Sequence, residues 1–213
     1  MTAPEAELRR VWQRVVGRHH DAAFEALMAR HREPHRRYHT ATHVMWVCRH
    51  VDELAGATAL PDPDAVLVAA LYHDAVYDPR APAGHNEQAS AALAARVLGE
   101  LGWPAARVAT VVALIEATAT HEPPADVDAA SAAVLLDADL AVLGADPAAY
   151  QAYVTGVRAE YAHVPDDAWR AGRTAVLDHF LDRPRLFLTD VMHAERHERA
   201  RANLTAERAA LHP

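Results

Sequence analysis

One short stretch of the sequence limits the possible folds more than any other. Residues 65–72 read AVLVAALY and are apolar on every side, after an Asp-Pro-Asp that suits the start of a helix. Such a run predicts a helix that is buried on all faces. It ends at His73-Asp74, and burying an imidazole and a carboxylate is costly unless they are paired or bind a metal. The pair is therefore either a capped, partly solvated helix end or part of a metal site.

The composition favours helices along the whole chain. The 213 residues are 51% hydrophobic but only 6% aromatic, with 8 glycines and several alanine-rich runs. We therefore expect an all-α fold, a compact single-domain helical bundle over residues 1–213. The net charge of −8 makes nucleic acid an unexpected partner, and Cys48 alone provides neither an intramolecular disulfide nor a Cys-rich zinc site. With no secretory signal and no apolar run of about 18 residues, we expect a cytoplasmic protein without a membrane partner.

Apolar residues at helical spacing predict the other helices. The first 32 residues predict one or two helices, with a bend at Gly17, and Val44 to Leu54 mark the buried face of the next. Asn86 suits the N-cap of a helix over 88–101. Further expected helices cover 104–120, 129–144, 147–163 and 166–181, followed by a charged C-terminal helix within 190–213 that is solvated from Glu195 on. Four histidines in polar contexts are expected at the surface: His19, His20, His31 and His35.

Ionisable residues on three of these helices form a candidate metal site. His43 falls in the first turn of its helix, where the positive helix end favours the neutral imidazole that binds metals. Asp139 lies in the apolar run LLDADLAVLG, and Asp137 points roughly 200° away from it, so at most one of the two faces a given site directly. With His73 and Asp74, the set offers two nitrogens and two oxygens. Such a set suits an octahedral divalent cation with positions left for water or phosphate.

The order H…HD…D on an all-α background resembles the HD superfamily of metal-dependent phosphohydrolases. Longer phrases are similar to a bacterial subfamily of predicted HD phosphohydrolases: RRYHTATH, LYHDAVYD, HNEQAS, TATH, LLDADLAVLG, VRAEY and AGR. The resemblance extends over residues 36–203 and implies a domain of the HD type. It also implies one divalent metal ion held by His43, His73, Asp74 and Asp139, with Asp137 nearby but not a ligand. The ion could be Mn²⁺, Mg²⁺, Fe²⁺, Co²⁺, Ni²⁺ or Zn²⁺.

The resemblance implies hydrolysis of a phosphoester or phosphoanhydride of a small molecule, with a nucleotide as the expected substrate, by metal-activated water. Proton transfer is expected from Asp74, Glu87 and His121. Glu87 and His121 also have a simpler interpretation as residues that suit the start and the end of a helix by their charge. The candidate phosphate contacts are Arg37, His39, Arg158, Arg173 and Arg185. For each arginine a structural ion pair is the alternative, and for His39 it is turn chemistry.

Two other classes of function stay open. A non-catalytic HD regulator would bind a nucleotide in the same place without turning it over. An HD-type oxygenase with two irons would need more His ligands, and only His121 is placed to serve as one. A homodimer is compatible with the amphipathic ends of the chain.

Overall fold

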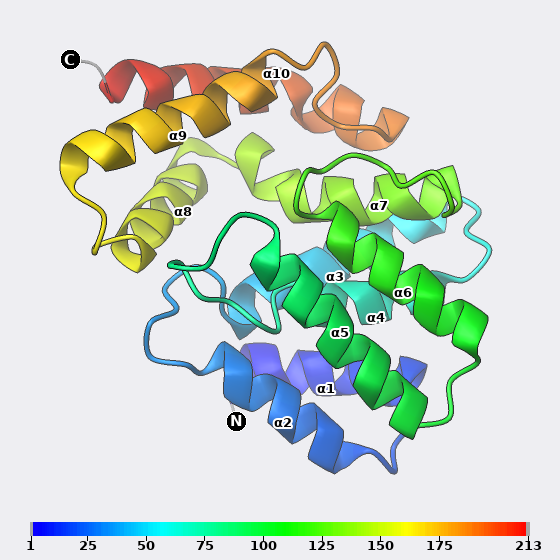
Figure 1. Ribbon diagram of the computed structural model, residues 1–213. Helices are drawn as coiled ribbons and strands as arrows, with labels where there is room; N and C mark the ends of the chain where they lie inside the picture. The colour runs from blue at the N-terminus through cyan, green and yellow to red at the C-terminus, as the bar shows by residue number, and fades with distance from the viewer. Residues whose placement is uncertain (1, 212–213) are drawn as a thin grey trace. The chain divides into compact units, whose positions relative to one another are not determined.

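The computed structural model describes residues 2–211, which form ten α-helices and one short 3-10 helix and contain no strand (Figure 1). The all-α prediction is therefore confirmed. The chain divides into two compact units, Met1–Asp139 and Leu140–Pro213, called unit 1 and unit 2 below. That both belong to one domain over 1–213 stays a prediction.

Unit 1 consists of helices that surround one central apolar helix. Their bounds are α1 Ala3–Val15, α2 Asp21–His31, α3 Ala41–Ala57, α4 Pro63–Tyr72, α5 His85–Glu100, α6 Ala105–Ala117 and α7 Ala129–Leu140, the last residue of which belongs to unit 2. Helix α4 packs against α1, α3, α5 and α6. All residues from Ala65 to Tyr72 are buried, as the apolar run predicts. The side chain of Asp62 caps the helix by accepting a hydrogen bond from the backbone N–H of Ala65 at 3.1 Å.

The first 32 residues form two helices rather than one. Gly17 has φ of 117°, in the left-handed region that favours glycine, and ends the first segment. Trp12 and Phe24 are both fully buried, with ring centroids 5.9 Å apart, so they join α1 to α2. The ring of Trp12 also lies 6.3 Å from that of Tyr72. The apolar face predicted for α1 thus packs on the central helix.

Two helix ends in unit 1 differ from their predicted positions. Helix α5 begins at His85 with Gly84 as its N-cap, in a left-handed conformation with φ of 77°, so the prediction of Asn86 as the N-cap was wrong. The amide of Asn86 instead exchanges two hydrogen bonds with the backbone of Asp78, at 3.0 and 3.1 Å. Helix α6 ends at Ala117, short of Thr120, and the chain then turns through His121.

Unit 2 contains η1 Ala141–Gly144, α8 Pro147–Glu160, α9 Asp166–Leu181 and α10 Asp190–Ala210. Helix α10 packs against η1 and lies beside α9 (Figure 1). The single helix expected over 129–144 is therefore an α-helix that tightens into a 3-10 turn after Leu140. A Cβ at Gly144 would lie 2.6 Å from the Cβ of Arg196 and 2.9 Å from its backbone oxygen. Only glycine allows η1 and α10 to approach so closely.

Helix α10 is charged, as predicted, but the expectation that it is solvated was wrong. Six of its residues are buried: Met192, His197, Ala200, Asn203, Leu204 and Glu207. The amide of Asn203 donates to the backbone oxygens of Leu143 and Ala145 at 2.8 and 3.0 Å. Polar side chains on the buried face therefore fasten α10 to the turn at η1, which the apolar pattern alone does not reveal.

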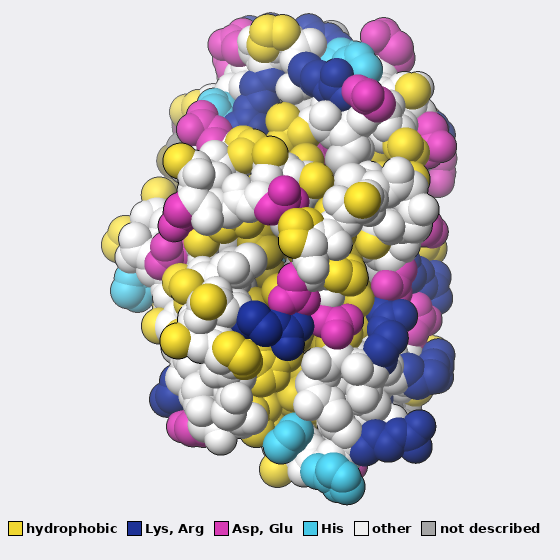
Figure 2. Space-filling view, turned by 90° about the vertical axis from the view of Figure 1, so that its right-hand side faces the viewer, with side chains coloured by type: hydrophobic (Ala, Val, Ile, Leu, Met, Phe, Trp, Pro, Cys, Tyr) yellow, Lys and Arg dark blue, Asp and Glu magenta, His cyan; other side chains and the backbone are white. Residues whose placement is uncertain are grey.

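Charged side chains of both signs are interspersed with hydrophobic ones on the face shown in Figure 2. Ion pairs also join separate helices of unit 1, such as Arg49 of α3 with Glu7 of α1 at 2.6 Å. Among the helices that the structure describes, none combines the length and the apolar character needed to cross a bilayer.

Candidate metal centre

Three side chains from three helices of unit 1 converge on one point. His43 comes from the first turn of α3, His73 from the end of α4 and Asp139 from α7, and one donor atom of each lies within 4.8 Å of the others. The Nε2 atom of His43 is 3.1 Å from Nε2 of His73 and 3.1 Å from Oδ1 of Asp139. Nε2 of His73 is 3.4 Å from the same Oδ1. This buried His/His/Asp group could hold a metal ion.

Asp74 lies beside this group of three and is not part of it. Its Oδ2 lies 3.1 Å from Nε2 of His73 and 3.3 Å from Nε2 of His43. These distances permit ion pairs with protonated imidazoles, yet the buried Oδ2 has no aligned hydrogen-bond donor among the described residues. Neighbouring ligands at about 2.1 Å from one cation lie about 3.0–3.4 Å apart. The donor atoms of His43, His73 and Asp139 therefore fit a divalent ion in both chemistry and spacing.

The carboxylates change the acid–base behaviour of the imidazoles. Burial alone lowers the pKa of His73, but Asp74 and Asp139 outweigh it and hold that pKa well above its usual value. The pKa of His43 is raised in the same way, so the helix start alone does not keep this residue neutral. Burial raises the pKa of each carboxyl, yet the neighbouring histidines hold both well below the usual range. Protons and a divalent cation thus compete for the same ring nitrogens.

A backbone contact fixes the orientation of the His73 ring. Its Nδ1 donates a hydrogen bond to the carbonyl oxygen of Ala70 at 2.8 Å, one turn back in α4. In the neutral ring the proton therefore stays on Nδ1, and the lone pair of Nε2 faces the cluster. Metal-binding histidines are commonly oriented by such a second contact.

A buried arginine that sequence reasoning missed connects two ligand-bearing segments. The side chain of Arg36 is completely buried and donates to the backbone oxygens of His39 at 2.9 Å, Asp74 at 2.8 Å and Ala75 at 3.3 Å. It also pairs with Glu33 at 3.1 Å. The adjacent arginines at 36 and 37 are visible in the sequence, but no local pattern says which of the two is buried.

His121 joins the cluster through Asp139. Its Nε2 lies 3.0 Å from Oδ2 of Asp139, while Oδ1 of the same carboxylate faces His43 and His73. The backbone of His121 has φ of 53°, a left-handed conformation that costs L-residues about 1–2 kcal/mol. Strained residues of this kind are found at functional sites. The structure therefore brings His121 to the site, as predicted.

Two further predicted residues, Glu87 and Asp137, do not belong to the group of three. Glu87 is half-buried in the first turn of α5, and no contact within residues 2–211 joins its carboxylate to the four donor atoms. Asp137 is buried on α7 and contributes no atom to the group around His43. That Asp137 lies near the ligands without being one stays a prediction.

The predicted phosphate contacts fall into two sets. His39 stacks on Tyr77 with ring centroids 4.3 Å apart and lies 5.8 Å from the ring of His43, so it borders the cluster. Arg37 donates to the backbone oxygen of Pro34 in the same loop. The remaining three form ion pairs inside unit 2: Arg158 with Asp166, Arg173 with Glu207 and Arg185 with Asp190. Their partners support the structural alternative for these three.

One residue expected at the surface is buried instead. His31, on α2, is 3% exposed, and neither ring nitrogen has a hydrogen-bond partner within residues 2–211. Burial, with a further contribution from the charge of Arg36, lowers its pKa to about 3. His31 is therefore neutral at physiological pH.

Comparisons with known proteins return no match for this chain, whether with protein-family models, curated proteins or solved structures. The structure itself shows a helical chain with a His/His/Asp group that could bind a metal. This arrangement is compatible with an HD domain.

Proposed function

We propose that this chain is a metal-dependent phosphohydrolase of the HD type, acting on a small phosphorylated molecule for which a nucleotide is the best candidate. The observation that carries the proposal is the convergence of His43 from α3, His73 from the end of α4 and Asp139 from α7, with Asp74 beside His73. Five distances between them lie at 3.1–3.4 Å. In this proposal His43, His73, Asp74 and Asp139 hold one divalent cation.

A divalent cation in such a site supplies a Lewis acid for a phosphate oxygen and makes bound water more acidic. The side chain of Asp74 is 18% exposed, the most open of the four, and takes the proton of the attacking water. His121 is oriented by Asp139 at 3.0 Å and moves a proton towards the leaving group. Glu87 is the alternative proton carrier, from the first turn of α5.

Phosphate binding is assigned to the segment before α3. The ring of His39 lies beside that of His43. Arg37, two residues before His39 in the sequence, is exposed. A guanidinium recognises phosphate with two parallel hydrogen bonds, which suits Arg37 if its side chain turns towards the site. Phosphoryl transfer depends mainly on positioning and charge neutralisation, which these residues and the cation together provide.

The first test is elemental analysis of purified wild type, His73→Ala and the control His19→Ala, which removes an exposed histidine outside the cluster. We expect about one metal ion per chain in the wild type and the control and none in His73→Ala. The same samples, supplied with Mn²⁺ and a panel of nucleotides, should release phosphate or pyrophosphate only where the metal is retained. Metal-dependent turnover that survives in Asp74→Ala would refute the proposed site.

The complete donor set also suits the second candidate, a nucleotide-binding HD regulator without turnover. The two candidates differ in one measurement on metal-loaded protein. Nucleotide binding without release of phosphate from any substrate would favour the regulator. Two metal ions per chain would instead favour the oxygenase class.

A further inference from the structure

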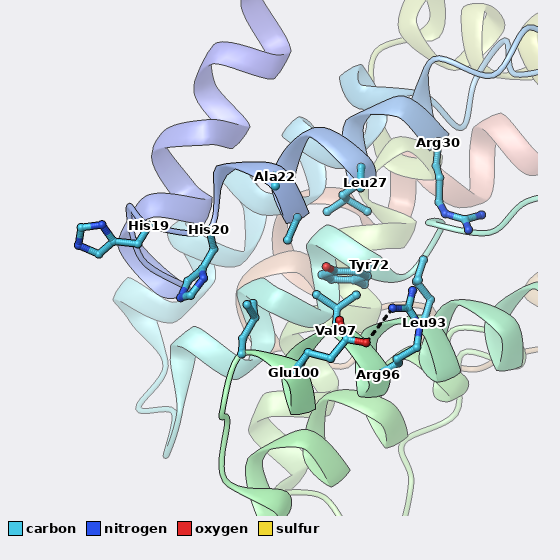
Figure 3. A pocket seen from close by; sticks show the side chains of 13 residues that line it. His19, His20, Ala22, Leu27, Arg30, Tyr72, Leu93, Arg96, Val97 and Glu100 are labelled. Carbon is cyan, nitrogen blue, oxygen red and sulfur yellow. Dashed lines mark hydrogen bonds and ion pairs between the residues drawn. The ribbon is translucent and has the colours of Figure 1, made fainter.

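A pocket of about 430 Å³ lies between α2 and α5 in unit 1, and its lining includes none of the proposed metal ligands (Figure 3). Leu27 of α2 and Leu93 and Val97 of α5 face it from opposite sides, and Tyr72, the last residue of α4, lies between them. The volume is in the range of small-molecule sites, which are mostly apolar with a few polar groups that orient the ligand.

The first such polar group is the hydroxyl of Tyr72. The residue is 1% exposed, yet its hydroxyl has no hydrogen-bond partner anywhere in the described part of the chain. A phenol hydroxyl is protonated at neutral pH and can donate a hydrogen bond. Tyr72 lines the pocket, so its hydroxyl can pair with an oxygen that enters there. A ligand oxygen would take the place of water at this hydroxyl.

The second polar group is the guanidinium of Arg30. Arg96 pairs with Glu100 at 3.1 Å, so these two charges on the pocket rim cancel. Arg30 is half-buried at the end of α2, and no ion pair or hydrogen bond of its guanidinium occurs within residues 2–211. Figure 3 shows Arg30 and Arg96 towards one end of the pocket and His20 towards the other. Arg30 therefore leaves one uncompensated positive charge at one end.

We propose that this pocket binds an elongated apolar monocarboxylate, such as a medium-chain acid that carries a further hydroxyl or carbonyl oxygen along its length. The carboxylate pairs with Arg30, since a guanidinium and a carboxylate match as a two-point contact. The apolar body lies along Leu27, Leu93 and Val97, and the further oxygen accepts from Tyr72. A single uncompensated charge matches a monoanion better than a phosphate dianion. From His20 to Arg30, α2 rises about 15 Å, the length of a chain of roughly ten carbons.

The test is isothermal titration of the full chain with decanoate, with hydroxydecanoates bearing the hydroxyl at mid-chain or at the far end, and with 1-decanol. The charge is probed by Arg30→Gln, with Arg10→Gln as its control on an exposed arginine of α1. The hydroxyl is probed by Tyr72→Phe, which keeps the ring. Val97→Trp fills the pocket from α5. None of these residues belongs to the metal centre, so the readout is independent of phosphohydrolase activity.

We expect decanoate to bind wild type and Arg10→Gln equally, and Arg30→Gln about tenfold more weakly. At least one hydroxydecanoate should bind more tightly than decanoate, and Tyr72→Phe should abolish that gain while leaving decanoate unchanged. Val97→Trp should bind none of the acids. The proposal is overturned if no acid binds, if 1-decanol binds as well as decanoate, or if Arg30→Gln and Arg10→Gln behave alike.

Discussion

Arg36 donates a hydrogen bond from Nη1 to the backbone oxygen of Asp74 at 2.8 Å, so a buried guanidinium holds the turn that carries two of the proposed ligands. The same Nη1 reaches the backbone oxygen of His39 at 2.9 Å. A single side chain thereby ties the segment before α3 to the turn after α4. We infer that this link helps to set the spacing of His43 and His73 through the backbone.

Replacing Arg36 by lysine keeps the charge but removes the planar fork that serves three carbonyl oxygens. We expect a loss of about 2 kcal/mol in the free energy of unfolding, because buried carbonyls lose their donors. Metal affinity should fall as well, since the ligand-bearing turns are no longer joined. Urea denaturation and metal titration measure the two effects. Arg10→Lys, on the surface, should change neither, and unchanged metal binding in Arg36→Lys would contradict the positioning role.

The strained backbone at His121 gives a second prediction. With φ of 53°, glycine is favoured over alanine at this position, so His121→Gly should be about 1 kcal/mol more stable than His121→Ala. Both variants lose the contact with Oδ2 of Asp139, and we expect both to bind metal about 10–100-fold more weakly than wild type. Thermal unfolding and metal titration separate backbone strain from the side-chain contact. Equal stability of the two variants would show that the backbone at position 121 leaves the left-handed conformation in His121→Ala.

Metal affinity should rise with pH, because protons compete with the cation for His43 and His73. The carboxylates raise the pKa of His43 and His73, so a cation competes with protons for these imidazoles up to a higher pH than it would at free histidines. Affinity should therefore rise with pH through these raised values and level off above them, by about tenfold per pH unit for each proton released. Calorimetric titrations with Mn²⁺ from about pH 6 to about pH 9 measure this slope. In Asp139→Asn the rise should move to lower pH, because one carboxylate charge is gone. An affinity that is independent of pH would contradict the competition.

The buried pair Arg173–Glu207 makes the fourth prediction. Its closest atoms lie 2.7 Å apart, both side chains are 7% exposed, and Tyr150 donates to the same carboxylate. Glu207→Gln leaves the guanidinium buried without its counter-charge and should cost about 3 kcal/mol.

The matched control is Asp166→Asn, which removes the mostly exposed partner of Arg158 and should cost less than about 1 kcal/mol. Thermal unfolding compares the two variants. If Arg173 bound phosphate instead, Arg173→Lys would raise KM and leave stability unchanged.

Features set by local chemistry were predictable from the sequence. The apolar run at 65–72 has no polar face, so only burial on all sides satisfies it, and α4 lies at the centre of unit 1. Its start also follows local rules, because Asp62 caps the helix and Pro63 occupies its first position. His43, His73 and Asp139 were identifiable because each interrupts or borders an apolar helix.

Features set by tertiary contacts were not predictable. Asn86 has the chemistry of an N-cap, but closing the loop after Asp78 competes for its amide, and Gly84 caps α5 instead. His31 sits in a polar stretch of sequence, yet its face of α2 is buried. Helix α10 looks solvated by composition because its buried face uses Asn203 and Glu207, whose partners are distant in sequence. In each case the partner decides the outcome, and helical periodicity carries no information about the partner.

The contact between His73 and Ala70 has a consequence for the rate at which a cation could enter. This ring is held by its own helix at 2.8 Å, and Arg36 holds the adjoining turn, so neither depends on an ion for its order. A cation would therefore bind to a preformed site. In a zinc finger, by contrast, the site folds only when the ion binds. Removing it with a chelator should leave the helical circular dichroism intact. Reloading should proceed in one fast phase, limited by the exchange of water and protons and without a slow step of chain rearrangement.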